Sequence, residues 1–370
     1  MAVRLENTEA CKARLMLALL KGIPRARLIK IIETAGSPER LFSTELERVS
    51  KGLSPDEMSA LIAGNPHDLD AQLSSVRKTE CGIVAWTDED YPELLRHIEY
   101  APPVIFFRGD ISLSSRPAVA IVGSRKCSAS GKFVAEKLAR DIAARGIVVV
   151  SGLARGIDSA AHRGALAAGG FTIAVLGCGV DICYPPENNK LLEEILRRGA
   201  AVSEFVLGTP PLKQNFPLRN RVISGISQAV VIVEAGETSG ALVTAMHALE
   251  QGREVFVVPG DTTLISTIGS NRLLKEGARP VTEAADILDE LVPGFGGELK
   301  PIPQVLPSAE TLSEEEETVL ECLSHVPAHV DQVCDRVGGR APAILSVLLS
   351  LELKGFVRQE PGNRFVRSNP

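Results

Sequence analysis

Residues that bind anions gather in the stretch SGLARGIDSAAHRGAL, at positions 151–166. Gly152 and Gly156 would let backbone N–H groups approach a phosphate closely, and Arg155 would donate forked hydrogen bonds to its oxygens. The helix expected to follow would favour negative charge at its first turn. Because the spacing is neither G-x-G-x-x-G nor G-x-x-x-x-G-K-[ST], the stretch predicts a phosphate site of another kind. Asp158 would either cap this helix or hold Arg155.

A second chemical cluster lies in KQNFPLRNR, at positions 213–221. Its cationic, amide and aromatic members are Lys213, Phe216, Arg219, Asn220 and Arg221. Cations that hold phosphates beside a ring on which a base can stack are typical of single-stranded nucleic-acid binding. Aromatic residues make up only 4% of the chain, which favours a specific role for this ring. The alternative is that Phe216 and Ile223 face the core while the arginines are solvated or cap a helix.

Both clusters follow segments that should be buried strands. The candidate strands cover residues 118–123, 146–152, 172–177, 200–205, 229–235 and 254–260. Segments rich in Ala and Leu, of helical length and period, separate them. Near-continuous apolar strands that alternate with helices predict an α/β fold, a Rossmann-like doubly wound parallel sheet with helices on both faces.

In such a sheet, ligands bind outside the carboxyl ends of the strands. The loops expected at that edge combine glycine with hydroxyl or charged groups, and Arg125 adds a guanidinium to the first of them. The candidate phosphate-binding positions are Gly123, Ser124, Ser151, Gly152, Arg155, Gly156, Gly177, Gly179, Ser239 and Gly240. Loops at the opposite edge, such as LAAGGFT at 166–172, are typical of helix ends. This asymmetry indicates a site at the carboxyl edge, although each glycine could also serve a tight turn alone.

Composition restricts the classes of function. The 370-residue chain has a net charge of −6, but residues 115–290 hold 19 Lys and Arg against 18 Asp and Glu, so a site for a polyanion must be locally cationic. No apolar run reaches the ~20 residues of a membrane span. The seven scattered cysteines form no C-x-x-C pair, which predicts reduced thiols in a cytoplasmic protein. His162 and His247 lack metal-ligand spacing and the serines lack a G-x-S-x-G elbow, so no metal, other cofactor or hydrolase chemistry is expected.

The sequence pattern divides the chain into four parts. Residues 1–75 show helical periodicity, and residues 76–292 hold the predicted sheet with an N-terminal extension. Residues 293–309 are rich in Pro and Gly, which is typical of a linker. Residues 310–370 predict three short helices and a hairpin, which together indicate a winged helix. The last of these helices has few basic residues for reading DNA, which favours contacts with protein.

Through about residues 80–290, the order and spacing of the motifs resemble those of the DNA-processing protein A family, DprA/Smf. The motifs that carry the resemblance are VGSR, SGLARGIDSAAHRGAL, AVLGCGVDICYPPEN, NFPLRNRVISGIS, VVIVEAGETSGALVTAMHALEQGREVFVVPG and GSNRLLKEGA. The two ends of the chain are similar to that family's SAM-like and winged-helix domains. The resemblance implies an extended Rossmann fold that binds DNA and not a dinucleotide.

The resemblance also implies a non-enzymatic, cytoplasmic bacterial protein that binds single-stranded DNA as a homodimer. Such a protein protects incoming DNA in natural transformation, during competence, and helps load the RecA recombinase onto strands covered by single-strand-binding protein. By motif, the candidates for contact with DNA are Arg125, Lys213, Phe216, Arg219 and Arg221. Backbone contacts to phosphate would come from Gly123, Gly152 and Gly156.

The alternative is an enzyme that acts on a nucleotide, with Glu234 or Asp158 as its acid or base. The wider superfamily includes phosphoribohydrolases that carry P-G-G-x-G-T followed by a glutamate. The corresponding loop here reads EAGETSGAL, without the paired glycines or the downstream acid. This departure argues against hydrolysis and leaves nucleotide binding open.

Overall fold

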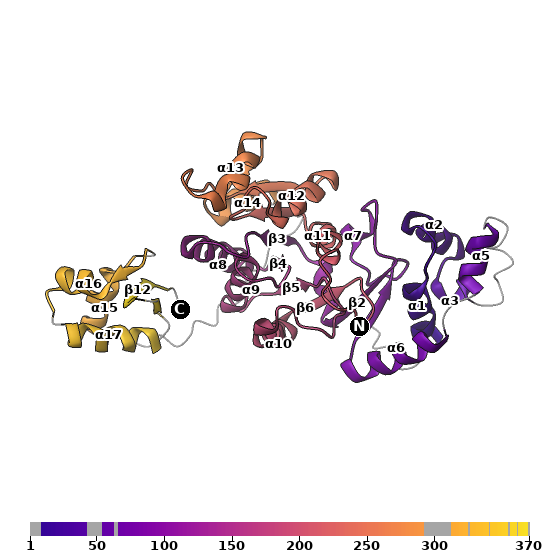
Figure 1. The fold of residues 1–370 in the computed structure, drawn as a ribbon, viewed down its shortest axis with the longest axis horizontal. Helices are drawn as coiled ribbons and strands as arrows, with labels where there is room; N and C mark the ends of the chain where they lie inside the picture. The colour runs from indigo at the N-terminus through magenta and orange to yellow at the C-terminus, as the bar shows by residue number, and fades with distance from the viewer. Residues whose placement is uncertain are drawn as a thin grey trace. The chain divides into compact units, whose positions relative to one another are not determined.

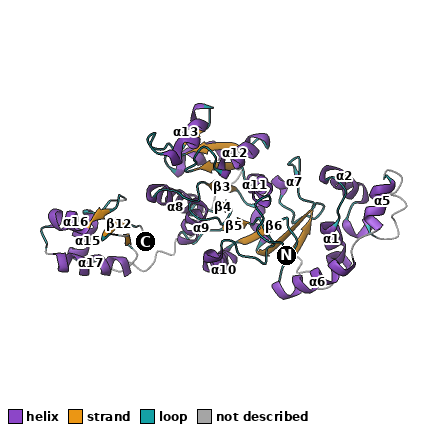
Figure 2. Ribbon diagram, in the orientation of Figure 1, coloured by secondary structure: helices purple, strands orange, loops and turns teal. Residues whose placement is uncertain are grey.

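The computed structural model describes residues 9–42, 54–62, 66–291, 312–324, 326–339, 341–353, 356–360 and 362–368. The chain forms two compact units, one of residues 1–127 with 135–302 and one of residues 128–134 with 303–370. Figure 1 labels their helices and strands, and Figure 2 colours them by type. The linker predicted at 293–309 lies outside the described residues, so its boundaries stay a prediction.

A nine-stranded sheet forms the centre of the larger unit. In chain order its strands are β1 (Gly82–Ala85), β2 (Val104–Gly109), β3 (Ala118–Val122), β4 (Val148–Ser151), β5 (Thr172–Val175), β6 (Ala200–Ser203), β7 (Ala229–Ile232), β8 (Glu254–Val257) and β9 (Arg279–Pro280). Their order in space is β1-β2-β6-β5-β4-β3-β7-β8-β9, with β2 antiparallel to β1 and β6 and all other pairings parallel. The predicted strands are confirmed as β3 to β8, and β1 and β2 extend the predicted parallel sheet at one end.

Helices connect and cover these strands. They are α1 (Glu9–Leu19), α2 (Arg25–Ala35), α3 (Pro38–Leu41), α5 (Pro55–Ile62), α6 (Pro66–Thr79), α7 (Glu93–Arg96), α8 (Ala129–Ala143), α9 (Ile157–Ala167), α10 (Asn189–Arg198), α11 (Asn215–Ile226), α12 (Gly240–Glu250), α13 (Ile268–Lys275) and α14 (Ala284–Leu291), with short 3-10 helices η1 (Ile111–Ser115), η2 (Pro186–Asn188) and η3 (Ile265–Thr267). From β3 to β8, each parallel strand leads to the next through one of the helices α8 to α12, because parallel strands need a long crossover.

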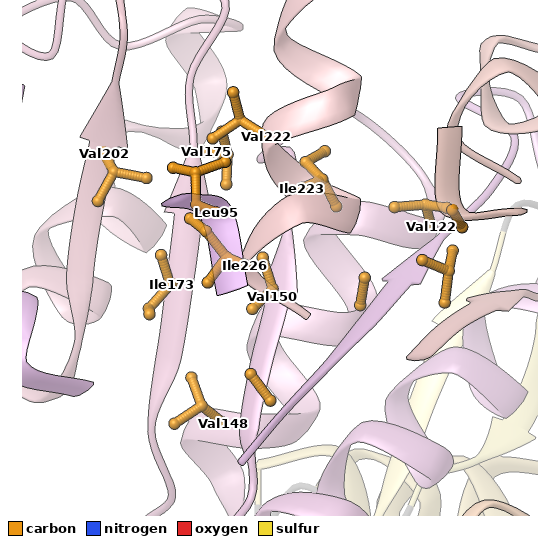
Figure 3. Packing of buried hydrophobic residues seen from close by; sticks show 14 of the residues in the cluster. Leu95, Val122, Val148, Val150, Ile173, Val175, Val202, Val222, Ile223 and Ile226 are labelled. Carbon is orange, nitrogen blue, oxygen red and sulfur yellow. The ribbon is translucent and has the colours of Figure 1, made fainter. Parts of the chain in front are cut away.

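Side chains alternate between the two faces of the sheet, as the two-residue period of a strand requires. On β5, Ile173 joins a hydrophobic cluster with α7, α11 and α12, whereas Ala174 joins a cluster with α1, α2, α6 and α10. Figure 3 shows the first cluster, in which Val222 and Ile226 of α11 pack with residues of the strands. This packing fixes α11 along the sheet and therefore decides where the first turn of α11 lies.

The N-terminal helices share the second cluster with the sheet. Leu15 of α1 and Ile32 of α2 are buried in the same cluster as Ile83 of β1 and Leu192 of α10. The boundary predicted after residue 75 falls within α6, the helix that precedes β1. The described helices of residues 1–75 therefore pack against the sheet, and their assignment as a SAM-like domain stays a prediction.

Between residues 312 and 368, the described part of the smaller unit holds three helices and a small sheet. Its elements are α15 (Glu314–Glu321), β10 (Ala328–His329), α16 (Val330–Val337), α17 (Ala341–Leu353), β11 (Val357–Glu360) and β12 (Arg364–Arg367). The strands are ordered β10-β12-β11, and Leu348, Leu351 and Phe365 lie in a hydrophobic core of this unit's own. This arrangement confirms the predicted winged helix. The sequence of α17, APAILSVLLSLEL, contains no Lys or Arg.

Candidate functional site

Several of the predicted anion-binding loops meet at one edge of the parallel sheet. They follow β3, β4 and β7, which are neighbours in the order β4-β3-β7. A pocket of about 490 Å³ opens there. The predicted residues that line it are Gly123, Ser124, Arg125, Phe216, Arg219, Asn220, Ser239 and Gly240. The fold therefore brings glycine turns and most of the KQNFPLRNR cluster to a single place.

Phe216 lies in the first turn of α11, and its ring is half-buried at the pocket. The guanidinium carbon of Arg125 is 4.9 Å from the centroid of the Phe216 ring, and that of Arg219 is 5.9 Å from it. The Tyr184 ring lies 5.7 Å away, centroid to centroid, at an angle of 39°. Ile223, two turns later, is buried in the core. The structure thus buries Ile223 in the core, as the alternative expected, where it also borders the pocket, and leaves Phe216 half-buried at the pocket.

Arg219 is a buried cation beneath the pocket, with 4% of its surface exposed. Its Nη1 donates to the carbonyl oxygen of Gly152 at 2.6 Å and to that of Val175, and its Nε donates to Oδ1 of Asn220 at 3.1 Å. Burial lowers the pKa of the Arg219 guanidinium from its usual value, and the nearby carboxylate of Asp158 opposes this shift. Arg219 therefore joins the ends of β4 and β5 to α11.

Asp158 closes the turn between β4 and α9. Its Oδ2 accepts hydrogen bonds from the N–H groups of Gly152 at 3.1 Å and Ala154 at 3.4 Å. A Cβ at Gly152 would lie 2.4 Å from Nη1 of Arg219 and 2.6 Å from Oδ2 of Asp158, so a larger residue does not fit between them. Burial raises the pKa of the Asp158 carboxyl, and Arg219 opposes the shift. The Gly152 N–H was expected to donate to a phosphate, but in the structure it donates to the carboxylate of Asp158.

Two other members of this turn also have internal partners. Arg155 is exposed, and its Nε donates to Oε1 of Glu187, so Arg155 pairs with Glu187 and not with Asp158. Arg155 also borders a smaller hollow beside Phe216. Ser151 is fully buried, and its Oγ donates to the carbonyl oxygen of Ile121 at 2.7 Å, which directs this hydroxyl away from any ligand.

The loop after β3 brings Ser124 and Arg125 to the pocket. The Ser124 N–H donates to the carbonyl oxygen of Glu234 at 2.6 Å, which holds this loop against the end of β7. Gly156, at φ 79°, passes so close that a Cβ there would lie 2.3 Å from the carbonyl oxygen of Ser124. Arg125 itself is exposed and forms no ion pair within the described ranges. It is therefore a cation available to a ligand.

The start of α12 forms another wall of the pocket. Ser239 caps this helix by accepting a hydrogen bond from the Ala241 N–H at 3.3 Å. Asn220 donates through Nδ2 to the carbonyl oxygen of Gly240 at 3.1 Å, which ties α12 to α11. The unpaired N–H groups and the dipole at a helix N-terminus favour an anion, so this wall complements the guanidinium of Arg125.

Arg221 and Lys213 do not line the pocket. Arg221 is only 5% exposed, forms an ion pair with Glu204 and donates to the carbonyl oxygen of Tyr100. Burial lowers its pKa, and Glu204 opposes that shift. Burial and the ion pair with Glu204 argue against the predicted contact of Arg221 with DNA, which stays a prediction. Lys213 is exposed just before α11, outside the pocket lining.

Gly177 and Gly179 also serve packing. A Cβ at Gly177 would lie 2.9 Å from Cδ1 of Phe216, so Gly177 lets the ring rest against the loop after β5. A Cβ at Gly179 would lie 2.4 Å from Oδ1 of Asp181. Neither glycine lines the pocket. These contacts give the glycines a packing role, in which Gly177 positions Phe216, and their role as phosphate-binding positions stays a prediction.

Sequence reasoning missed Lys126, Thr238 and Tyr184. Lys126 and Thr238 line the main pocket, and Tyr184 lines the smaller hollow beside Phe216. A signal for Lys126 was present, because it follows Arg125 directly. Tyr184 is one of only three tyrosines and lies in a loop at the same edge. Its contact with Phe216 could not be inferred, since 32 positions separate the two residues.

Two further observations concern metals and membranes. Among the described residues, no group of three or more His, Cys, Asp or Glu side chains is placed to hold a metal ion. No helix in that part of the chain combines the length and the apolar character needed to cross a membrane.

Comparisons with known proteins agree with the motifs. A family model described as DNA recombination-mediator protein A matches residues 82–292, and a model of the DprA winged helix domain matches residues 303–363. Protein Smf of Escherichia coli is 40% identical over 319 residues, which is 84% of each chain. The structure of DNA processing protein A from Streptococcus pneumoniae is 34% identical and superposes with a TM-score of 0.64, covering 77% of this chain and 99% of that one.

The Helicobacter pylori DNA processing protein A is a second structural relative, and its structure is described for a single-stranded DNA binding mode. It is 30% identical, with a TM-score of 0.53, and covers 58% of this chain and 96% of that one. The first family model spans more than half of the chain, and the second matches residues of the smaller unit. The chain therefore belongs to the DNA recombination-mediator protein A family, DprA/Smf.

Proposed function

We propose that this protein binds single-stranded DNA at the carboxyl-edge pocket and acts as a recombination mediator without catalysing a reaction. The observation that carries the proposal is the placement of the Phe216 ring beside Arg125 at an open pocket, with Tyr184 next to it. Ring and cation together suit a strand, since bases stack on rings while phosphates meet cations. The single-stranded DNA binding described for the Helicobacter pylori relative supports the same reading.

A strand would use three kinds of contact at this pocket. A base stacks on the Phe216 ring, on the face that the Arg125 guanidinium now covers, and displaces that guanidinium toward a neighbouring phosphate. A second phosphate lies at the N-terminus of α12, beside Gly240. Arg219 stays in place beneath the Phe216 ring, because the carbonyl oxygens of Gly152 and Val175 hold its guanidinium. It adds positive charge to the pocket without touching the DNA.

The arrangement of the acids supports binding over hydrolysis. The Asp158 carboxylate accepts hydrogen bonds from two backbone N–H groups and lies beside Arg219, so it is engaged in closing a turn. Glu234 is 3% exposed, and its carbonyl oxygen anchors the loop of Ser124. Asp158 borders the pocket, but its carboxylate is engaged by these hydrogen bonds, and Glu234 does not line the pocket, so the arrangement favours binding over the general acid or base catalysis that nucleotide hydrolysis needs.

The cellular role follows from the family. We infer a cytoplasmic homodimer that protects incoming single strands in natural transformation and helps load RecA onto strands covered by single-strand-binding protein. The family membership supports these partners, and the cationic pocket supports the strand. Purified chain, RecA and single-strand-binding protein in a strand-exchange assay test the loading step directly.

Gel-shift titration tests the DNA-binding proposal. Single-stranded and duplex oligonucleotides of one sequence are titrated with each protein at two salt concentrations. The proteins are the parent, a triple variant that combines Arg125→Ala, Lys213→Ala and Phe216→Ala, and a control. The control, Lys275→Gln, removes an exposed lysine of α13. We expect the parent and the control to bind the single strand more tightly than the duplex. The triple variant should bind the single strand more weakly than the parent. Equal binding by parent and triple variant would refute the site. Release of free base from nucleoside monophosphates would refute the non-catalytic role.

A further inference from the structure

A second pocket, of about 510 Å³, opens at the opposite edge of the same sheet. It lies where β5 and β6 begin and where β2 ends, because β2 runs antiparallel to β6. Its walls include Arg108, Arg197, Arg198 and Phe171. From the sequence, only helix ends were predicted at this edge. The pocket was not visible there, because Arg108 and Arg197 are about ninety positions apart in the chain. The fold alone brings them together.

The arginines of this pocket are only partly explained by the fold. Arg198 donates through Nη1 to the carbonyl oxygen of Gly169 at 2.9 Å, and a cation at Arg197 suits the C-terminus of α10. Arg108 lies one residue before the end of β2, where no helix dipole acts. Within the described ranges, neither Arg108 nor Arg197 forms an ion pair or a side-chain hydrogen bond. Two guanidinium groups are therefore available to a ligand.

The acids at this pocket do not cancel these cations. Asp110 accepts hydrogen bonds from the N–H of Ser112 at 3.0 Å and from its Oγ at 2.6 Å, so this carboxylate caps η1. Glu80 is the other acid in the lining. Three arginines against two acids leave the lining positive.

Phe171 gives this pocket an aromatic wall. The guanidinium carbon of Arg116 lies 4.6 Å from the centroid of the Phe171 ring. The pair has the same form as Arg125 and Phe216 at the first pocket, where the distance is 4.9 Å. A half-buried ring with cations beside it is a platform on which a base can stack.

Arginines continue along this edge of the sheet. In the strand order β2-β6-β5-β4-β3, the residues at the edge are Arg108, Arg197, Phe171, Arg145 and Arg116. Arg116, Arg145 and Phe171 shortly precede β3, β4 and β5, whereas Arg197 lies in the last turn of α10 before β6. Because neighbouring strands lie roughly 4.8 Å apart, these positions are spread across this end of the sheet. Cations spread along an edge can meet successive phosphates of a strand, whereas a free nucleotide would use only the pocket.

We propose that this edge, defined by Arg108, Arg116, Arg145, Phe171 and Arg197, is a second binding site for single-stranded nucleic acid. A base stacks on Phe171 in the pocket, and the neighbouring phosphates meet the arginines along the edge. With sites at both ends of the sheet, one chain holds two strand segments at once. The inference rests on the proposed function only for the class of ligand, because the two sites share no residue.

Photo-crosslinking of the full chain separates the two sites. A single strand that carries iodouracil is irradiated with the protein, and the crosslinked peptides are mapped by mass spectrometry. We expect crosslinks at Phe171 and at Phe216. In Arg108→Gln with Arg197→Gln, the Phe171 crosslink should fall roughly tenfold, since two charge-assisted contacts are lost. The slope of log affinity against log salt should also fall by about 0.7 for each lost contact.

Controls decide between the outcomes. Lys137→Gln with Lys275→Gln removes two exposed lysines elsewhere and should leave the Phe171 crosslink unchanged, and thermal melting checks that every variant folds. A Phe171 crosslink that survives Phe216→Ala supports the second site even where the first site fails. Absence of that crosslink in the parent, or its persistence in the arginine variant, overturns the inference. Competition by thymidine monophosphate or inorganic phosphate as strong as that of the strand assigns the pocket to a small phosphate ligand and also overturns it.

Discussion

The guanidinium carbon of Arg125 lies 4.9 Å from the centroid of the Phe216 ring, although 91 positions separate the two residues in the chain. Arg125 comes from the loop after β3, and Phe216 comes from the first turn of α11. Their meeting places an exposed cation and a stacking surface at one pocket, which is the combination that single-strand binding needs.

Removal of the Phe216 ring should weaken strand binding. Phe216→Ala is expected to cost on the order of 1–3 kcal/mol in affinity for a single strand, because the stacking surface is lost. Phe216→Trp keeps a ring and should retain most of the affinity. Fluorescence anisotropy with a labelled oligonucleotide measures both variants. An alanine variant that binds as the parent does would exclude Phe216 from the interface.

Removal of the Arg125 guanidinium should act on all sequences alike. Arg125→Ala loses a phosphate contact, so the slope of log affinity against log salt should fall by about 0.7. Titrations of homopolymeric strands over a salt series measure the slope, with Lys275→Gln as the control. A loss confined to one base composition would mean that Arg125 reads a base and does not hold a phosphate.

The buried pair of Arg221 and Glu204 predicts an effect on stability without an effect on binding. Glu204→Ala leaves the Arg221 guanidinium buried beside no carboxylate and also removes the ion-pair partner of Arg25, which together should cost about 3–5 kcal/mol in the free energy of unfolding. Arg221→Met combined with Glu204→Gln should recover much of that loss. Urea unfolding measures each variant. A large loss of DNA affinity in the stable double variant would return Arg221 to the interface.

His162 predicts a loss of stability in acid. Its Nδ1 lies 2.7 Å from Oγ1 of Thr172, and that hydroxyl already donates to the carbonyl oxygen of Val149 at 2.6 Å. Nδ1 must therefore be the donor, which leaves the buried Nε2 deprotonated and without a hydrogen bond among the described residues. A proton on Nε2 would bury an unpaired charge. Burial accordingly lowers the pKa of His162 to about 3.

The sign of the pH effect follows from this lowered pKa. The folded pKa lies below the unfolded value of 6.5, so the contribution of His162 to stability is complete above pH 6.5 and is lost as the pH falls toward 3. Between these values, the parent should lose up to about 1.4 kcal/mol per pH unit more than His162→Gln. Urea unfolding over a pH series tests this. Parallel curves for parent and variant would contradict it.

The winged helix is expected to contribute little to strand affinity. Its third helix, α17, has no Lys or Arg and exposes Leu345 and Leu349, which suits contact with protein more than with phosphates. A chain that ends at about residue 300 should therefore keep most of its affinity for single-stranded DNA. Gel-shift titration of the shortened chain gives the answer, and a large loss of affinity would contradict the expectation.

The sequence by itself determined the repeating pattern of strand and helix and the edge at which the first site lies. Apolar runs at β3 to β8 mark buried parallel strands, and the glycine-rich loops mark their carboxyl ends, since both are local properties of the chain. The residues Arg125 and Phe216 were also visible, because a cation in a glycine turn and an isolated aromatic differ from their surroundings.

Only the tertiary structure decided which cations face a ligand. Arg219 and Arg221 are two positions apart, yet one braces the pocket from beneath and the other pairs with Glu204, because helix geometry points them at different neighbours. The N–H of Gly152 donates to Oδ2 of Asp158, because the turn between β4 and α9 folds back on itself. At the opposite edge, Arg108 and Arg197 meet through the antiparallel pairing of β2 with β6, a long-range register that no local pattern encodes.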